Sequence, residues 1–231
     1  GIPEEYGGRT DVENASYRMQ EIARGRMPKE EGMLGIGLNM AIPIILQYGT
    51  EEQKRRFIPS TLNAQEVWCQ LFSEPGSGSD FAGLSAKGEK DGDEWICNGQ
   101  KVWTTLAHLS RFGLLVVRTD AEAVKHAGLT AFVVDMQAPG VEVRPLRQMT
   151  GEAEFNEVYF TDVRIAEAEM LGNPGDGWRV SLTTLMNERT AIGGGGGGNA
   201  KRRGPIDETI RVWRETPEAQ RDPAQKDRLM K

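Results

Sequence analysis

Cysteine and histidine are both scarce in this chain of 231 residues, which contains two of each. The two cysteines, Cys69 and Cys97, are too few for a disulfide framework or a zinc cluster. The two histidines, His108 and His126, lie far apart in the sequence and match no common metal-ligand spacing. The composition therefore argues against a metal site.

Long apolar runs are missing as well. The longest, Leu114 to Val117, is far shorter than the ~20 residues that a membrane helix needs, and it is typical of a strand. No charged-then-apolar leader opens the sequence, so we expect a cytoplasmic protein without membrane insertion. The chain begins with Gly1, not with Met, and we expect it to be a fragment of a longer protein.

Positive charge is also limited. The net charge is -6, and residues 201–231 carry nine Lys and Arg against six Asp and Glu, which gives this segment +3 and the remainder -9. Such a weak basic signature argues against a nucleic-acid partner. With 38% hydrophobic and 27% charged residues, the chain is typical of an ordinary globular protein.

The sequence divides into three regions that differ in their pattern of apolar and turn residues. Residues 1–66 are helical in pattern, residues 67–170 are rich in β-forming residues, and residues 171–231 return to a helical pattern. In the first region Thr50 and Gln53 form a capping-box pattern, which predicts a helix that ends at Pro59. We therefore expect an α+β protein with three domains, cut at these boundaries.

The middle region consists of short runs of β-forming residues separated by turn clusters. Because no helical pattern lies between the runs, they predict an antiparallel barrel or sandwich. Asn98-Gly99 lies between two of these runs and predicts a hairpin turn, since both positions of a type I′ turn need positive φ.

Six consecutive glycines occupy positions 193–198 and satisfy the spacing G-x-G-x-x-G. A dinucleotide-binding loop of this type follows a strand and opens a helix, whereas this run follows a helical pattern. We interpret it as a helix interruption.

Two segments of the β region could bind a ligand. Ser73 to Asp80 is a loop of small residues that follows a buried-looking strand; it is either an ordinary surface loop or a place where backbone N–H groups approach an anion. Trp103 and Thr105 share one face of their strand, because side chains alternate. They could cover and hydrogen-bond an aromatic ligand, or form a cross-strand packing pair.

Taken together, four segments resemble motifs of the acyl-CoA dehydrogenase family, in the family's order. Gly1 to Gly8 is similar to the GxPxExGG segment of its N-terminal domain, and Tyr48 to Lys54 reads YGTEEQK. Ser73 to Asp80 resembles the TEPGAGSD signature, and Asn98 to Thr105 resembles NGQKxWIT. The resemblance runs through nearly the whole chain and is closest to bacterial members.

This resemblance implies an α-helical N-terminal domain, a central antiparallel β-barrel and the start of a C-terminal four-helix bundle. It also implies FAD held between barrel and bundle, with an acyl-CoA beside it. The residues that match the family's FAD-binding positions are Phe72, Ser73, Ser79, Trp103 and Thr105, and those that match its substrate-binding positions are Ser79 and Arg189.

The reaction implied by the resemblance is α,β-dehydrogenation of the acyl-CoA to a trans-2-enoyl-CoA, with electrons passed to an electron-transfer flavoprotein. A carboxylate must remove the α-proton. A minority of family members carry it on the first long bundle helix before an Arg, where this chain has Glu188-Arg189. Glu188 is therefore our candidate base. The alternatives are that Glu188 is an ion-pair partner or a residue of the CoA pocket, and that the base lies beyond residue 231.

Two other functions remain open on the same scaffold. One is a flavin oxidase that passes its electrons to oxygen. The other is a non-catalytic subunit of a mixed oligomer, since Ser73 replaces the usual Thr and the family's Arg-x-x-Phe-Gly segment is absent from this sequence. The resemblance implies a homotetramer or dimer, and the mixed oligomer is its alternative.

Overall fold

The computed structural model describes residues 2–8, 32–193 and 205–217. The chain forms two compact units, Gly1–Ile192 and Gly193–Lys231, and each is considered by itself. In the second unit the described helix is α5, Pro205–Glu215. Positions 194–198 of the glycine run lie outside the described residues, and so does our interpretation of them as a helix interruption.

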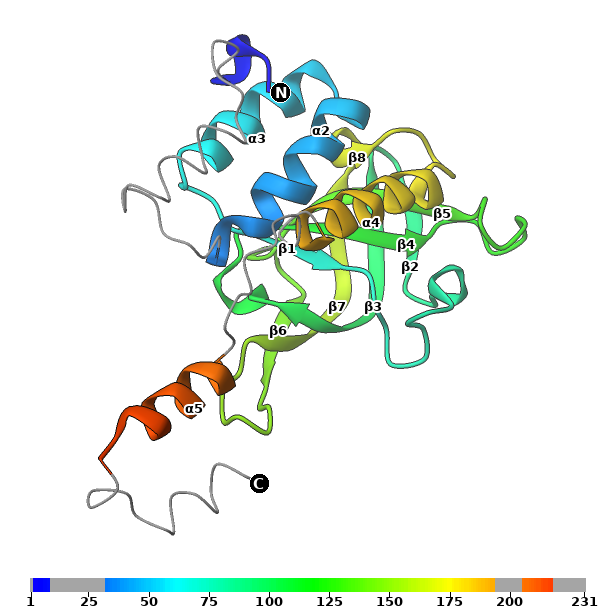
Figure 1. Ribbon diagram of the computed structural model, residues 1–231. Coiled ribbons are helices and arrows are strands. Elements are labelled where there is room, and N and C mark those ends of the chain that lie inside the picture. Colours follow the sequence, from blue (N-terminus) through cyan, green and yellow to red (C-terminus); the bar gives the residue numbers. More distant parts are fainter. Residues whose placement is uncertain (1, 9–31, 194–204, 218–231) are drawn as a thin grey trace. The chain divides into compact units, whose positions relative to one another are not determined.

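In the first unit, helices gather on one side of a β-sheet (Figure 1). The main helices are α2, Ile42–Tyr48, α3, Glu51–Leu62, and α4, Gly177–Gly193; a π-helical turn, Gly37–Ala41, leads into α2. Short 3-10 turns occupy Glu4–Tyr6, Gly32–Leu34, Phe81–Gly83, Ala107–Leu109 and Glu167–Glu169. None of the helices described is long and apolar enough to cross a membrane.

Helix α3 begins as its sequence predicts and ends later than predicted. The Thr50 side chain accepts from the Gln53 N–H, and the Gln53 side chain accepts from the Thr50 N–H, so the capping box is present. The helix continues through Pro59 to Leu62. A proline inside a helix removes one hydrogen bond. Phe57 and Ile58, which precede it, are fully buried, and we attribute the continuation of the helix to this packing.

The β region forms one eight-stranded sheet in the order β6-β7-β3-β2-β4-β5-β8, with β1 also paired to β4. Its strands are Trp68–Leu71 (β1), Lys87–Asp91 (β2), Glu94–Thr105 (β3), Phe112–Arg118 (β4), Leu129–Asp135 (β5), Val141–Leu146 (β6), Phe155–Ala166 (β7) and Met170–Leu171 (β8). The prediction of a purely antiparallel barrel needs correction. The described sheet is mixed, because β1 and β2 pair with β4 in parallel. It is also not closed, because its end strands, β6 and β8, do not pair with each other. The one sign of parallel pairing in the sequence is the continuous apolar run of β4, which is buried on both faces.

The hairpin predicted at Asn98-Gly99 is wrong. Strand β3 runs through both residues, and the turn lies earlier, at Gly92, between β2 and β3. Gly99 instead marks a register shift against β7, with φ +147°. A Cβ at Gly99 would lie 2.5 Å from the Cβ of Ala86. The glycine therefore permits a close approach of two chain segments, not a reversal.

Strands β4 and β5 divide the apolar residues into two cores, because their successive side chains point to opposite faces. Phe112, Leu114 and Val116 pack with the helices, whereas Leu115 and Val117 pack with β3 and β7. The first core is anchored by Trp68, whose ring meets those of Phe57 and Phe112 and whose N–H donates to Thr61. The helices are thereby fixed against the sheet.

The second core contains both cysteines. Cys69 on β1 and Cys97 on β3 are free thiols with no exposed surface. Burial raises the pKa of each thiol to about 12. They therefore behave as small apolar side chains in the interior.

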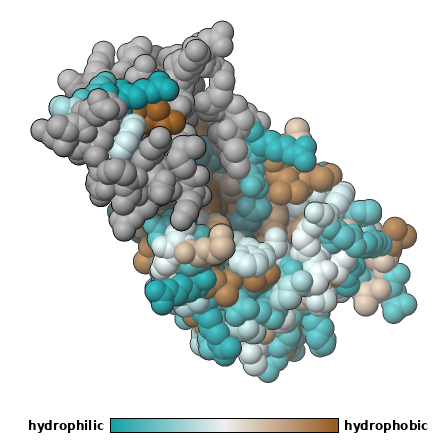
Figure 2. Space-filling model, turned by 60° about the horizontal axis from the view of Figure 1, so that its bottom comes forward, coloured by the Kyte–Doolittle hydropathy of each residue, from teal (hydrophilic) through white to brown (hydrophobic). Residues whose placement is uncertain are grey.

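The surface is mixed in character. On the face shown in Figure 2, hydrophilic residues predominate and hydrophobic residues form small separate groups between them. Among the described residues with large exposed apolar side chains are Trp103, Leu182 and Met186. Trp103 is taken up below because it lines a pocket.

We expect Thr50→Ala to lower the free energy of unfolding by about 1 kcal/mol, because the first turn of α3 loses its side-chain acceptor. Chemical denaturation of the purified protein measures this. Thr50→Ser retains a hydroxyl and is the matched control, which should stay close to the wild type. Equal losses in the two variants would show that the cap is not the cause.

Candidate active site

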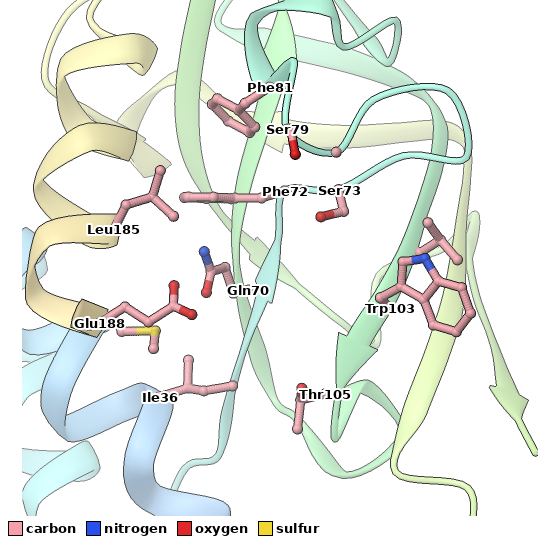
Figure 3. Close-up of a pocket in the computed structure, with 13 residues that line it drawn as sticks. Ile36, Gln70, Phe72, Ser73, Ser79, Phe81, Trp103, Thr105, Leu185 and Glu188 are labelled. Atoms are coloured by element: carbon pink, nitrogen blue, oxygen red, sulfur yellow. The ribbon is translucent and has the colours of Figure 1, made fainter. Parts of the chain in front are cut away.

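A cavity of about 570 Å³ lies between the helices and the sheet. Figure 3 shows its two sides: α4 and the segment before α2 on one, and β1, the following loop and β3 on the other. Its lining consists of Ile36, Met40, Gln70, Phe72, Ser73, Gly78, Ser79, Phe81, Val102, Trp103, Thr105, Leu185 and Glu188. A cavity of this size suits an organic ligand of moderate size.

Most residues singled out from the sequence meet in this cavity. Those that line it are Phe72, Ser73, Ser79, Trp103, Thr105 and Glu188. Arg189 follows Glu188 on α4; it is exposed and does not line the cavity. The roles assigned to all seven residues stay predictions, because the geometry brings side chains together without saying what they bind.

Ser73 lines the cavity and has polar groups without a partner among the described residues. Strand β1 ends at Leu71, and the Ser73 carbonyl accepts from the N–H of Val102, 2.9 Å away on β3. Within the described part of the chain, neither the Ser73 N–H nor its hydroxyl has a hydrogen-bond partner. The same is true of the Ser79 and Thr105 hydroxyls. A ligand in the cavity can therefore meet several unused hydrogen-bonding groups.

Behind Ser73, a buried ion pair joins the loop to β3. The Lys101 ammonium lies 2.9 Å from the Glu74 carboxylate, and their side chains are 0% and 3% exposed. Burial alone would raise the pKa of Glu74, but Lys101 and the hydrogen bonds from Ser85 hold it below its usual value. Burial lowers the pKa of the Lys101 ammonium, and its contact with Glu74 acts against that shift. A charged Glu74 in this interior needs a charged partner, and Lys101 is in place to be that partner.

The loop after Ser73 is a compact turn. Glu74 and Ser77 exchange backbone hydrogen bonds of 2.8 and 3.0 Å, and the Ser77 hydroxyl donates to the Asp80 carbonyl. At the far end, Lys125 holds the Asp80 carboxylate at 2.6 Å. Hydrogen bonds and an exposed ion pair thus tie the loop that carries Ser79 to itself and to Lys125.

Trp103 forms the wall opposite α4, and its backbone is in an uncommon conformation. Its φ is +59°, in the left-handed region, and its side chain is 64% exposed. The register of β3 against β7 shifts between Lys101 and Thr104, which is where this residue lies. Irregularities of this kind re-aim a side chain, and strained residues cluster at functional sites. Trp103 and Thr105 both reach the cavity, as the alternation of side chains predicts.

The helical wall carries a single acidic group. Glu188 is half-buried on α4, one turn after Leu185, and it projects toward Gln70 on β1 (Figure 3). Ile36 and Met40 complete this side. Sequence reasoning missed Gln70, Ile36 and Met40 as lining residues. Gln70 precedes the recognised segment by three positions on a buried-looking strand, which is the one signal that could have found it.

We expect Trp103→Gly to unfold at a higher denaturant concentration than Trp103→Ala, with a difference of about 1 kcal/mol in unfolding free energy. Both variants lose the indole. Only the alanine variant still has a Cβ that makes the left-handed conformation at this position energetically unfavourable. Chemical denaturation of the two proteins side by side measures the difference. An alanine variant at least as stable as the glycine variant would show that residue 103 is not strained.

Two domain models of one protein family match the chain. The acyl-CoA dehydrogenase N-terminal domain matches residues 1–65, and the acyl-CoA dehydrogenase middle domain matches residues 69–163. The middle-domain match contains the loop after β1 and the whole of β3. It therefore includes every cavity residue that comes from the sheet.

Two curated relatives come from Mycobacterium tuberculosis. The chain is 44% identical to acyl-CoA dehydrogenase FadE34 over 91% of its own length and 28% of that protein's length. It is 46% identical to acyl-CoA dehydrogenase IpdE1, over 82% of this chain and 49% of that protein. The chain thus spans half or less of the length of these relatives.

Among solved structures, the chain is similar to the "Tcur3481-Tcur3483 steroid ACAD". The sequence identity is 30% and the TM-score is 0.74, over 93% of this chain and 52% of that one. The arrangement of helices and sheet described above is therefore shared with a protein that is described as a steroid ACAD.

Proposed function

Because this chain belongs to the acyl-CoA dehydrogenase family, we propose that it forms the flavin- and substrate-binding part of an enzyme that dehydrogenates acyl-CoA thioesters at the α and β carbons. The product is a trans-2-enoyl-CoA, and the electrons go to an electron-transfer flavoprotein. One observation carries the proposal: a single cavity gathers an exposed indole, unused hydroxyls and one carboxylate, Glu188.

Proteins of this family are FAD flavoproteins, and the sheet side of the cavity fits a flavin. A flat ring can lie against the exposed Trp103, and the unused N–H and hydroxyl of Ser73 suit acceptors on its edge. We assign Phe72, Ser73 and Thr105 to the ring, and Ser79 to the pyrophosphate and the CoA pantetheine. The chemistry that FAD supplies when bound is acceptance of a hydride from the β carbon.

Glu188 is the proposed base for the α-proton. The α-proton of a thioester is weakly acidic, so its removal needs a positioned carboxylate and a site from which water is kept out. Leu185 and Met40 line the cavity on the side of Glu188, and their apolar side chains help to keep water away from it. Arg189, exposed on the same helix, is proposed to contact CoA outside the cavity.

We propose a bulky, steroid-type acyl group as the substrate class. The support is the structural similarity to a steroid ACAD at a TM-score of 0.74. Comparing turnover of a steroid side-chain CoA thioester with that of a linear acyl-CoA tests this: a preference for the linear substrate would argue against it.

A mixed oligomer is the second candidate arrangement. The observation that favours it is that the same solved structure is described by two protein names, Tcur3481 and Tcur3483. In that arrangement this chain supplies the sheet side of a site, and a second, different chain is required for turnover. Turnover by the purified protein alone would exclude the non-catalytic role.

The full-length protein that carries this sequence should be yellow as purified. Its visible flavin absorbance should bleach when a suitable acyl-CoA is added without oxygen, because the substrate reduces the flavin. Absorbance spectroscopy in an anaerobic cuvette is the measurement. A colourless protein that cannot be reconstituted with FAD would refute the proposed function, and peroxide formed as fast as the enoyl product would identify an oxidase.

Glu188→Gln should lower the rate of flavin bleaching about 100-fold or more, because general-base catalysis typically contributes at least that factor. Stopped-flow absorbance at saturating acyl-CoA measures this rate. The control is Glu152→Gln, an exposed carboxylate outside the cavity, which should leave the rate unchanged. If Glu188→Gln bleached at the wild-type rate, the base would be a residue in another part of the protein.

A further inference from the structure

Lys101 is a fully buried charge that the proposed reaction does not use. Lysine is almost never completely buried unless its charge is paired, yet this side chain has no exposed surface and lies directly behind the cavity. It is on β3, just before the register shift that leads to Trp103. Its position therefore needs an explanation beyond packing.

The ion pair that Lys101 forms with Glu74 is well satisfied. One carboxylate oxygen accepts from Lys101 at 2.9 Å and from the Ala86 N–H at 3.0 Å. The other accepts from the Ser85 N–H at 2.6 Å and from its hydroxyl at 2.8 Å. A buried pair still costs desolvation, and an apolar pair of similar shape is often as stable. Stability alone therefore does not account for it.

The pair also fixes the peptide that borders the cavity. The Lys101 ammonium donates to the Phe72 carbonyl at 3.1 Å, and the next residue of β3, Val102, donates its N–H to the Ser73 carbonyl at 2.9 Å. The carbonyls of Phe72 and Ser73 thus each accept a hydrogen bond from β3, one from Lys101 and the other from Val102. The N–H of the Phe72–Ser73 peptide, which belongs to Ser73, has no acceptor within the described residues.

We propose that Lys101 is a positioning residue that orients and polarises the Phe72–Ser73 peptide, so that the Ser73 N–H binds the flavin and stabilises its reduced form. The inference rests on the proposed function. A cation on the carbonyl of a peptide draws electron density from it and makes its N–H a stronger donor. Reduced flavin carries more negative charge than oxidised flavin, so a stronger donor favours the reduced form and raises the reduction potential.

The decisive variant is the double substitution Glu74→Gln with Lys101→Met. It removes both charges together and leaves neither one buried alone. The matched control is Lys87→Met with Glu89→Gln, which removes an exposed ion pair of 2.7 Å on β2 of the same sheet. For each full-length protein, the dissociation constant of oxidised FAD is measured by titrating the apoprotein, and the reduction potential is measured with reference dyes.

We expect the dissociation constant of oxidised FAD to rise about tenfold in the buried-pair variant and that of reduced FAD about a hundredfold, since a hydrogen bond to a charged acceptor is the stronger one. The tenfold difference corresponds to a fall of about 30 mV in the potential of this two-electron couple. The control should match the wild type. Equal weakening of both redox forms, or no weakening, would overturn the proposal, because a merely structural role leaves the potential unchanged.

Two single substitutions keep the proposal testable if the double variant does not fold. Lys101→Arg keeps the positive charge and should keep the wild-type potential, whereas Lys101→Gln keeps a donor without the charge and should lower it. The same potential in both variants would overturn the proposal. A wild-type protein that fails to bind FAD would instead refute the proposed function, so the two failures are distinguishable.

Discussion

The register shift in β3 is the constraint on which the cavity depends. Before the shift, Lys101 points into the interior and holds the segment after β1; after it, Trp103 is exposed and forms a wall of the cavity. A regular strand alternates its faces strictly, and here Lys101 and Val102 are both buried in succession. Because of the shift and the left-handed φ of Trp103, one strand contributes both Lys101, which is buried, and Trp103, which lines the cavity.

Much of the sheet side of the site was predictable from the sequence, because its residues lie in contiguous segments with distinctive composition. Ser73 to Asp80 and Asn98 to Thr105 led to the family, and each segment contributes three residues to the cavity: Ser73, Gly78 and Ser79 from the first, and Val102, Trp103 and Thr105 from the second. The helical side was less accessible. Ile36 and Met40 are apolar residues in an apolar segment, and only the packing of α4 and the π-helical turn against the sheet makes them lining residues.

Local patterns failed where a distant contact decided the conformation. Asn98-Gly99 has the composition of a hairpin turn, but Gly99 is needed for its approach to Ala86, thirteen positions earlier. The pair of Lys101 and Glu74 could not be foreseen either, since each residue is typical of exposed surface and they are 27 positions apart. Helix α3 shows both cases. Its start is fixed by a local capping box and was predicted, whereas its end, beyond Pro59, was not.

The two buried thiols have a practical consequence. With a pKa of about 12, each cysteine is a neutral thiol at pH 8, and neither has a surface that a reagent can reach. Cys69 lies on β1 and Cys97 on β3, the two strands that frame the cavity. Their alkylation therefore reports how often the second core, in which both thiols are buried, opens locally.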